Sequence, residues 1–108
     1  MSATDRSTTF SCEFFPPRTE AGIEKLAMTQ QALNRVIQPA YYSVTFGAGG
    51  STRDSTLETV KQLAISKVEI APHITCIGSS QQQMSDLLNA YQELGVTQLV
   101  ALRGDIPA

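Results

Sequence analysis

Four short runs of apolar and β-branched residues divide the chain, at positions 9–14, 41–46, 68–75 and 97–102. Runs of this length and composition are typical of β-strands. They begin about every thirty residues, and each gap holds a longer segment whose apolar residues recur with the period of an α-helix. The pattern predicts repeated βα units and hence an α/β fold with a parallel sheet.

Each gap also carries a signal for the start of its helix. Thr19 follows two prolines and suits the N-cap of the first helix. The second helix is expected to begin near Ser51 or Thr52. The third helix has a capping-box sequence, Ser80 followed three residues later by Gln83.

A core follows from the same periodicity. Gly95 is expected to end the third helix. The strands are near-continuous apolar runs, which are typical of strands buried on both faces of a parallel sheet. The residues expected to pack in the core are Ile23, Leu26, Ala27, Leu33, Val44, Leu57, Val60, Leu63, Ala64, Ile70, Ile74, Met84, Leu87, Leu88, Tyr91, Leu99 and Val100.

The composition is that of an ordinary globular protein. The 108 residues are 42% hydrophobic and 17% charged, with a net charge of -2, which indicates one domain or part of one. The slightly acidic balance gives no electrostatic footprint for nucleic acid or for an anionic membrane surface. We therefore expect neither as a partner.

The N-terminal segment, the length of the apolar runs and the two cysteines predict the compartment and the metal content of the protein. Residues 1–8 are small and polar and are expected to be flexible; they lack the apolar core of a signal peptide. No run approaches the ~18 apolar residues of a membrane span. Cys12 and Cys76 lie inside apolar runs without metal-ligand spacing, which predicts buried, reduced thiols and no metal site. A cytoplasmic protein is expected.

Polar side chains cluster where the predicted strands end. The carboxyl ends of parallel strands lie at one edge of a sheet, and this edge carries the chemistry in parallel barrels and doubly wound sheets. The residues that would converge there are Glu13, Thr45, His73, Arg103 and Asp105.

Glu13 is the most informative of these residues, and two interpretations of it are open. A strand-end glutamate can be a salt-bridge partner, here of Arg18 or Arg103. Alternatively, the adjacent Phe14 and Phe15 would desolvate the carboxylate, which is the condition for a general acid near neutral pH.

The other strand ends are also ambiguous on residue type alone. His73 could be a core histidine or a ligand contact, and its place after Pro72 at a strand end favours the second. The glycines in positions 47–50 suit either a structural turn or a phosphate cradle, without the lysine of a P-loop. Positions 103–105, Arg-Gly-Asp, suit either a local ion pair or a clamp beside a cofactor. A phosphate site on the glycine loop would suit an unrelated barrel enzyme such as an aldolase or isomerase. No lysine stands at a strand end, which argues against a Schiff-base aldolase.

Four motifs in order carry a family resemblance: FSCEFFPPR at 10–18, SVTFG at 43–47, APHITC at 71–76 and ALRGDIP at 101–107. Together they resemble the N-terminal half of bacterial methylenetetrahydrofolate reductases. The resemblance implies a (β/α)₈ TIM barrel, non-covalent FAD, and NADH or NADPH as the reductant of 5,10-methylenetetrahydrofolate to 5-methyltetrahydrofolate. This activity belongs to one-carbon metabolism and methionine biosynthesis.

The resemblance also assigns roles by position. Glu13 matches the proton donor to the folate, and Asp105 matches the carboxylate near flavin and folate. Thr45 matches a position at the flavin that also meets the nicotinamide. The positions implied to line the flavin are Thr45, Phe46, Ala48, His73, Arg103, Gly104 and Asp105, and those implied to contact substrate are Glu13, Thr45 and Asp105.

The chain is expected to hold four strands and three helices, whereas a complete barrel needs eight strands and about 250 residues. Residues 1–108 are therefore interpreted as a partial TIM-barrel reductase domain that stops after the fourth strand. The alternative to the family activity is an inactive half-barrel with at most residual flavin or folate binding. Its open strand edges would favour self-assembly into a homo-oligomer.

Overall fold

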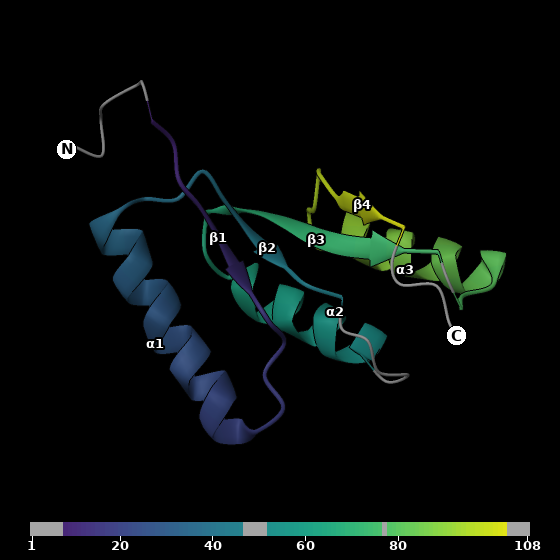
Figure 1. Ribbon diagram of the computed structural model, residues 1–108, viewed down its shortest axis with the longest axis horizontal. Helices are drawn as coiled ribbons and strands as arrows, with labels where there is room; N and C mark the ends of the chain where they lie inside the picture. The colour runs from purple at the N-terminus through teal and green to yellow at the C-terminus, as the bar shows by residue number, and fades with distance from the viewer. Residues whose placement is uncertain (1–7, 47–51, 77, 104–108) are drawn as a thin grey trace.

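The computed structural model describes residues 8–46, 52–76 and 78–103, with residues 52–54 described by their backbone alone. Strands and helices alternate along the chain (Figure 1). The elements are β1 (Ser11–Phe14), α1 (Glu20–Val36), β2 (Tyr41–Val44), α2 (Thr52–Leu63), β3 (Glu69–Thr75), α3 (Gln81–Glu93) and β4 (Val100–Leu102). The predicted alternation of strands and helices is confirmed.

The strands form one sheet in the order β1-β2-β3-β4, and every neighbouring pair is parallel. The register pairs Ser11 with Tyr41, Tyr41 with Glu69, and His73 with Val100. Sequential parallel strands joined by helices are the arrangement of the first half of a (β/α)₈ barrel. The predicted α/β fold class is confirmed.

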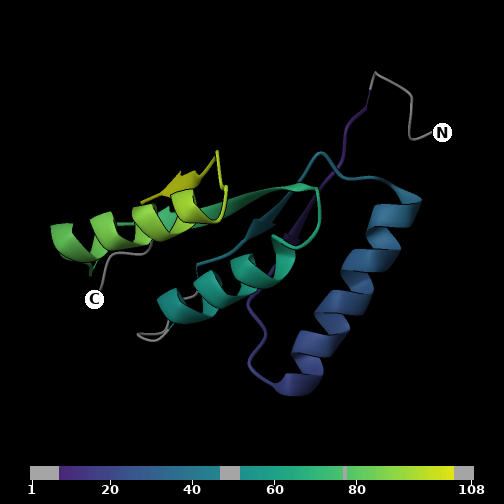
Figure 2. The same cartoon turned by 180° about the vertical axis from the view of Figure 1, so that it is seen from behind.

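One face of the sheet packs against the helices. Figure 1 shows α2 passing behind β1 and β2, and Figure 2, seen from behind, shows it in front of them. Side chains alternate between the faces of a strand, so Tyr42 and Val44 of β2 point together into this core. The buried cluster consists of Leu26, Tyr42, Val44, Val60, Leu63, Ile70, Ile74, Leu87 and Tyr91.

The predicted helix starts are confirmed where the structure describes them. The side chain of Thr19 accepts a hydrogen bond from the backbone N–H of Gly22 at the start of α1. Ser80 and Gln83 form both hydrogen bonds of the capping box at the start of α3. Gly95 follows the end of α3 with φ of 84°, a left-handed conformation that glycine adopts without steric cost.

A buried polar network ties α1 to its neighbours. The hydroxyl of Tyr42 lies 3.3 Å from the carbonyl oxygen of Gln30 and also contacts Oδ1 of Asn34. The side-chain amide of Gln30 donates to the carbonyl oxygen of Leu63, at 3.3 Å. Because these groups are largely buried, their pairing removes a desolvation cost and fixes α1 over β2 and the end of α2.

Some expectations about burial and length need correction. All four strands are shorter than predicted. Burial on both faces holds for the central strands β2 and β3, where Ser43 and Ala71 are buried on the face away from the helices, but not for β1 and β4, whose residues are in part exposed. Ile23, Leu88 and Leu99 are exposed at 45%, 39% and 41% instead of packing in the core. The flexible N-terminus predicted at residues 1–8 falls, except for Thr8, outside the described residues.

Candidate functional site

Glu13 and His73 meet on the face of the sheet opposite the helices. Nε2 of His73 lies 3.3 Å from Oε1 of Glu13. The His73 side chain is only 13% exposed, whereas that of Glu13 is 52% exposed. A carboxylate at the carboxyl end of β1 is thus held by a largely buried imidazole of β3 while remaining open to solvent.

The two side chains meet across an intervening strand. Glu13 pairs in register with Ser43 of β2, and Ser43 pairs with Ala71 of β3. Both of these small residues are buried, and they lie on the same face as Glu13 and His73 by strand alternation. Ser43 was not singled out from the sequence. The alternation of side chains along the predicted strand indicates which face Ser43 is on. It does not give the register that places Ser43 beside Glu13.

The expected surroundings of Glu13 need correction. Phe14 points to the helix side and packs against Tyr42, with ring centroids 5.3 Å apart, because successive residues of a strand face opposite ways. Phe15 is 75% exposed. The aromatic pair therefore does not enclose the carboxylate. Among the described residues, the ion-pair partner of Glu13 is His73 rather than Arg18 or Arg103.

The strand ends around the pair are held by hydrogen bonds. The backbone N–H of Thr45 donates to the carbonyl oxygen of Phe14 at 3.0 Å, and the carbonyl oxygen of Thr45 accepts from the hydroxyl of Thr56 at 3.0 Å. The hydroxyl of Thr75 donates to the carbonyl oxygen of Arg103 at 3.0 Å. These contacts fix Thr45 and Arg103 at the carboxyl edge of the sheet, as the strand-end pattern predicts.

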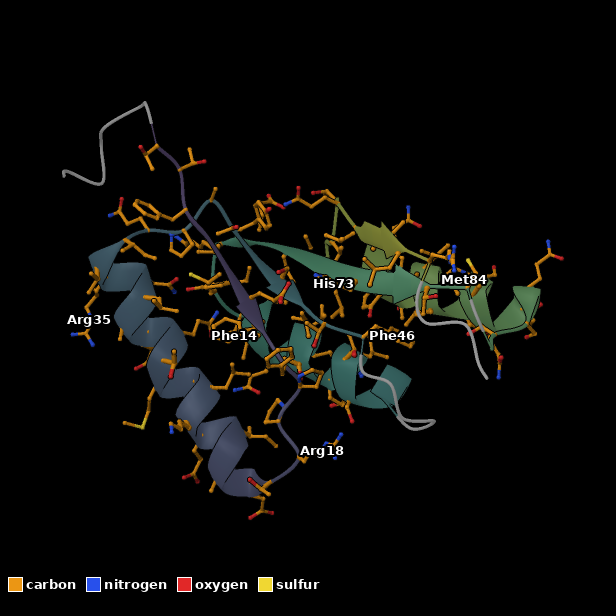
Figure 3. The ribbon with its side chains drawn as sticks, viewed as in Figure 1. Phe14, Arg18, Arg35, Phe46, His73 and Met84 are labelled. Atoms are coloured by element: carbon orange, nitrogen blue, oxygen red, sulfur yellow. The ribbon has the colours of Figure 1, made fainter. Side chains whose placement is uncertain are left out.

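The remaining predicted site residues are distributed unevenly. Phe46, labelled in Figure 3 with Phe14 and His73, is half-buried and packs against the core cluster. The side chain of Arg103 is exposed. Ala48, Gly104 and Asp105 lie outside the described residues, as do the glycines at 47–50.

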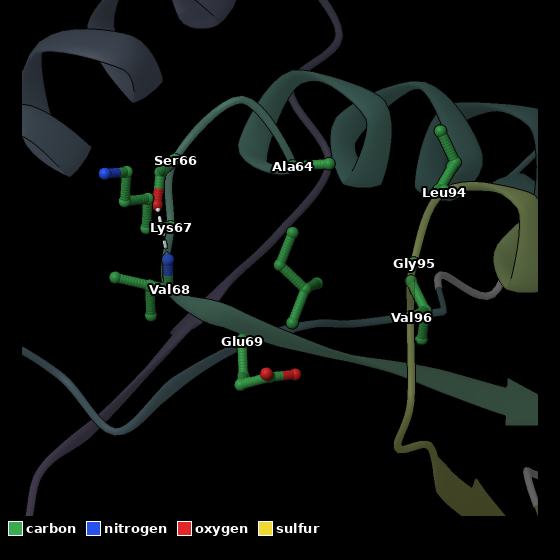
Figure 4. Close-up of a pocket in the computed structure, with 9 residues that line it drawn as sticks. Ala64, Ser66, Lys67, Val68, Glu69, Leu94, Gly95 and Val96 are labelled. Carbon is green, nitrogen blue, oxygen red and sulfur yellow. Dashed lines mark hydrogen bonds between the residues drawn. The ribbon is translucent and has the colours of Figure 1, made fainter.

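In the described part of the chain, pockets flank the sheet at both ends of β3. One, of about 420 Å³, lies beside the start of α3 and is lined by Cys76, Ser80, Met84 and Leu88 among others. The other, of about 160 Å³, lies between the start of β3 and the segment that follows α3 (Figure 4). The first is at the same edge as the Glu13 and His73 pair, whereas the second is at the amino edge.

The two cysteines differ from the prediction and from each other. Cys12 is half-buried on the helix side, where burial raises the pKa of its thiol. Cys76 is exposed directly after β3, so its predicted burial is wrong. Both are free thiols.

The described part of the chain offers neither a metal site nor a membrane-spanning helix. It contains no group of three or more His, Cys, Asp or Glu side chains placed to hold a metal ion. None of its helices combines the length and the apolar character needed to cross a membrane.

The fold and site define a class: a parallel α/β protein of barrel type with a carboxylate and an imidazole in contact toward the carboxyl edge of the sheet. A family model described as methylenetetrahydrofolate reductase matches residues 1–108. The chain belongs to the methylenetetrahydrofolate reductase family.

Curated relatives agree. A 5,10-methylenetetrahydrofolate reductase from Pectobacterium carotovorum subsp. carotovorum is 41% identical over 100 residues, which cover 90% of this chain and 33% of the relative. That from Escherichia coli strain K12 is 37% identical over 98 residues, with the same coverage of 90% and 33%. A probable methylenetetrahydrofolate reductase (NADH) from Oryza sativa subsp. japonica is 37% identical over 108 residues, which cover 97% of this chain and 18% of the relative.

The chain is shorter than these relatives. It spans 33% of the length of the bacterial proteins and 18% of the plant protein, and corresponds to their N-terminal part.

Proposed function

We propose that this chain forms the first half of the active site of a methylenetetrahydrofolate reductase, which reduces 5,10-methylenetetrahydrofolate to 5-methyltetrahydrofolate with FAD and a nicotinamide dinucleotide. The observation that carries the proposal is the position of the Glu13 carboxylate. It lies at the carboxyl end of β1 and contacts His73 on the face of the sheet opposite the helices, which we call the open face. Family membership supports the proposed reaction, and the position of Glu13 supports its proposed use as the acid.

Glu13 is proposed to donate the proton that assists opening of the folate's five-membered ring. A general acid must reach the reacting nitrogen directly, within about 3 Å. The half-exposed carboxyl group of Glu13 projects from a strand that fixes its position while leaving one side free for a substrate. The same residue buried on the helix side could not make this contact.

The carboxyl edge suits a flavin in the described part of the site. His73, Thr45 and Arg103 lie at or near the carboxyl ends of their strands, and Arg103 is exposed. The Thr45 hydroxyl and the Arg103 guanidinium can donate hydrogen bonds to flavin oxygens, and the ring nitrogen of His73 that does not face Glu13 can make a hydrogen bond of its own. The residues proposed to hold FAD are Thr45, Phe46, Ala48, His73, Arg103, Gly104 and Asp105, of which Thr45 and Asp105 would also contact substrate. When bound, FAD would carry hydride from NAD(P)H to the folate.

The reductant is proposed to be NADH or NADPH. The plant relatives carry NADH in their names, so NADH is the first to be tested. We place this chemistry in the cytoplasm and in one-carbon metabolism.

A chimera tests the proposal. Residues 1–108 would replace the matching third of the Pectobacterium reductase, and the two half-reactions would be followed separately by flavin absorbance. We expect flavin reduction by NADH and its reoxidation by methylenetetrahydrofolate. Glu13→Gln should preserve the first and slow the second by about 100-fold or more, the range for loss of a general acid.

Glu20→Gln is the matched control, because Glu20 is an exposed carboxylate at the start of α1, away from the strand ends. It should leave both half-reactions unchanged. A folded, flavin-loaded chimera that never reoxidises with folate would refute the proposed function. Equal loss of both half-reactions in Glu13→Gln would remove Glu13 from its assigned role.

The isolated chain tests the alternative of a half-barrel with residual binding. FAD fluorescence would be titrated with the 108-residue protein and with its His73→Ala variant. Quenching that weakens in the variant would show that this half binds flavin by itself. A titration without quenching would assign flavin binding to the complete barrel.

A further inference from the structure

The resemblance gives Glu13 and His73 separate roles, one at the folate and one at the flavin. Their side chains nevertheless form one unit, with Nε2 of His73 at 3.3 Å from Oε1 of Glu13. Among the described residues, His73 makes no other side-chain hydrogen bond or ion pair. A largely buried imidazole that is committed to one carboxylate oxygen constrains how that carboxylate can point.

The contact depends on what lies between the two strands. β1 and β3 are both neighbours of β2, so their backbones are about 9.6 Å apart, two strand spacings. Glu13 and His73 can meet only by reaching over β2. The path is diagonal, because Ser43 is in register with Glu13 and with Ala71, and His73 lies two residues beyond Ala71 on β3. Ser43 borders this path on β2 and Ala71 borders it on β3, and their small side chains, exposed by only 6% and 3%, leave room for the contact.

We propose that His73 is the positioning residue of Glu13, and that Ser43 is the spacer that permits their contact. The inference rests on the proposed function for its catalytic consequence but not for the contact itself. The imidazole N–H donates to Oε1, which leaves Oε2 to carry the proton toward the open face. In the transfer, the O–H bond at Oε2 breaks, an N–H bond forms on the folate, and the electron pair stays on Glu13.

After the transfer, the Glu13 carboxylate is stabilised by the N–H of His73, because hydrogen bonds to charged acceptors are stronger than those to neutral ones. His73 thus fixes the direction of the acid before the reaction and favours its anion afterwards. A bulky residue at position 43 would separate the pair while leaving both functional side chains in the protein.

The chain offers a clean spectroscopic test, because His73 is its only histidine. Long-range ¹H–¹⁵N spectra of the 108-residue protein would show one imidazole, and its nitrogen shifts report which nitrogen carries the proton. We expect a proton on Nε2. Glu13→Ala should shift the nitrogen signals, and so should Ser43→Leu although it keeps Glu13 and His73.

Two controls separate spacing from general perturbation. Ser43→Ala should leave the imidazole spectrum unchanged, because the inference requires small size rather than a hydroxyl. Ser11→Leu makes the same substitution as Ser43→Leu at an exposed position two residues before Glu13 on the same strand face, and it should also have no effect. If Ser43→Leu does not fold, Glu13→Ala still tests whether His73 and Glu13 are in contact. Unchanged imidazole signals in Glu13→Ala would overturn the inference.

The chimera tests the effect of the contact on catalysis. Ser43→Leu should slow flavin reoxidation by folate by about 100-fold, the cost of misplacing a reacting group by about 1 Å, with flavin reduction by NADH and flavin content retained. His73→Gln should recover part of the activity lost in His73→Ala, because the glutamine amide can also donate to Glu13.

Failure of the inference and failure of the proposed function look different. An intact contact by NMR in a chain whose chimera does not reduce folate would refute the function alone. A chimera that reduces folate at an unchanged rate when Ser43 is replaced by leucine would refute the positioning role alone.

Discussion

Tyr42 and Tyr91 are both almost completely buried, but their hydroxyl groups are in opposite situations. That of Tyr42 meets Gln30 and Asn34. That of Tyr91 is buried and has no hydrogen-bond partner in the part of the chain that the structure describes. The two residues therefore form a matched pair for measuring the value of a buried hydrogen bond.

Replacing each tyrosine by phenylalanine should change stability in opposite directions. Tyr42→Phe leaves Gln30 and Asn34 with one partner fewer and should lower the free energy of unfolding by about 1 kcal/mol. Tyr91→Phe removes an unpaired polar group and should raise it by about 1 kcal/mol. Urea unfolding followed by circular dichroism measures both. A loss of stability in Tyr91→Phe equal to that in Tyr42→Phe would show that the Tyr91 hydroxyl has a partner.

Tyr91 also predicts a response to alkaline pH. Burial raises the pKa of Tyr91 to about 12, whereas an unfolded tyrosine titrates near 10. Between about pH 10 and pH 12 the unfolded state has lost the proton that the folded state keeps. The contribution to stability is therefore complete below about pH 10 and is lost as the pH rises through this window.

The measurement is urea unfolding at several pH values from about 8 to 11. The wild type should lose stability toward the alkaline end, and Tyr91→Phe should lose less. Burial and then Cys12 also raise the pKa of Tyr42, so part of the slope should remain in Tyr91→Phe. Identical slopes in the two proteins would contradict the assignment.

At the scale of single elements, α3 has the most complete local signals. Its capping box satisfies two backbone N–H groups. The N–H of Ser80 donates to the side-chain oxygen of Gln83, and the N–H of Gln83 donates to the hydroxyl oxygen of Ser80. Ser80→Ala should therefore lower the free energy of unfolding by about 1 kcal/mol.

Thermal or urea unfolding checks this value, with Ser85→Ala as the control. Ser85 is exposed in the second turn of the same helix, where alanine should change stability by less than about 0.5 kcal/mol. Equal effects of the two substitutions would show that the box contributes nothing beyond helix propensity.

Elements were predictable from the sequence where their signals are local. Thr19, Ser80 and Gly95 mark helix ends through their own chemistry, and each marks one in the structure. The strand ends were less predictable, because a strand begins where its partner does. Residues 9 and 10 belong to the first apolar run, but β1 begins at Ser11 because its register partner Tyr41 is the first residue of β2.

The site was predictable in part for the same reason. The carboxyl edge follows from parallel topology, which places Glu13 and His73 on the same side of the molecule. Their contact depends on register across three strands, which aligns Glu13 with Ser43 and Ala71 and places His73 two residues further along β3. No local pattern encodes that register, so Arg18 and Arg103 were equally acceptable partners for Glu13 from the sequence.

On the scale of the whole molecule, the sheet has two unpaired edges among the described residues, on β1 and on β4. Unpaired strand edges are templates for association. Leu99 and Leu102 add apolar surface at the β4 edge, each 41% exposed. We expect the 108-residue chain to associate as its concentration rises.

Sedimentation velocity over a range of concentrations measures this association. Leu102→Lys should weaken it, because a charge at a strand edge opposes pairing with another chain. Val36→Lys is the control, since Val36 is an exposed apolar residue at the end of α1, away from both edges. A monomer at every concentration, or equal effects of the two substitutions, would contradict edge pairing.

Because the two cysteines are unequally buried, we expect only one of them to react with thiol reagents. Alkylating reagents attack the thiolate, and burial suppresses that form at Cys12, whereas Cys76 is exposed at the end of β3. A maleimide dye should therefore couple once, at Cys76, as peptide mapping by mass spectrometry can verify, and Cys76→Ser should remain unlabelled. Such a dye would sit three residues beyond His73, so its emission would report directly on the arrival of a flavin or a folate.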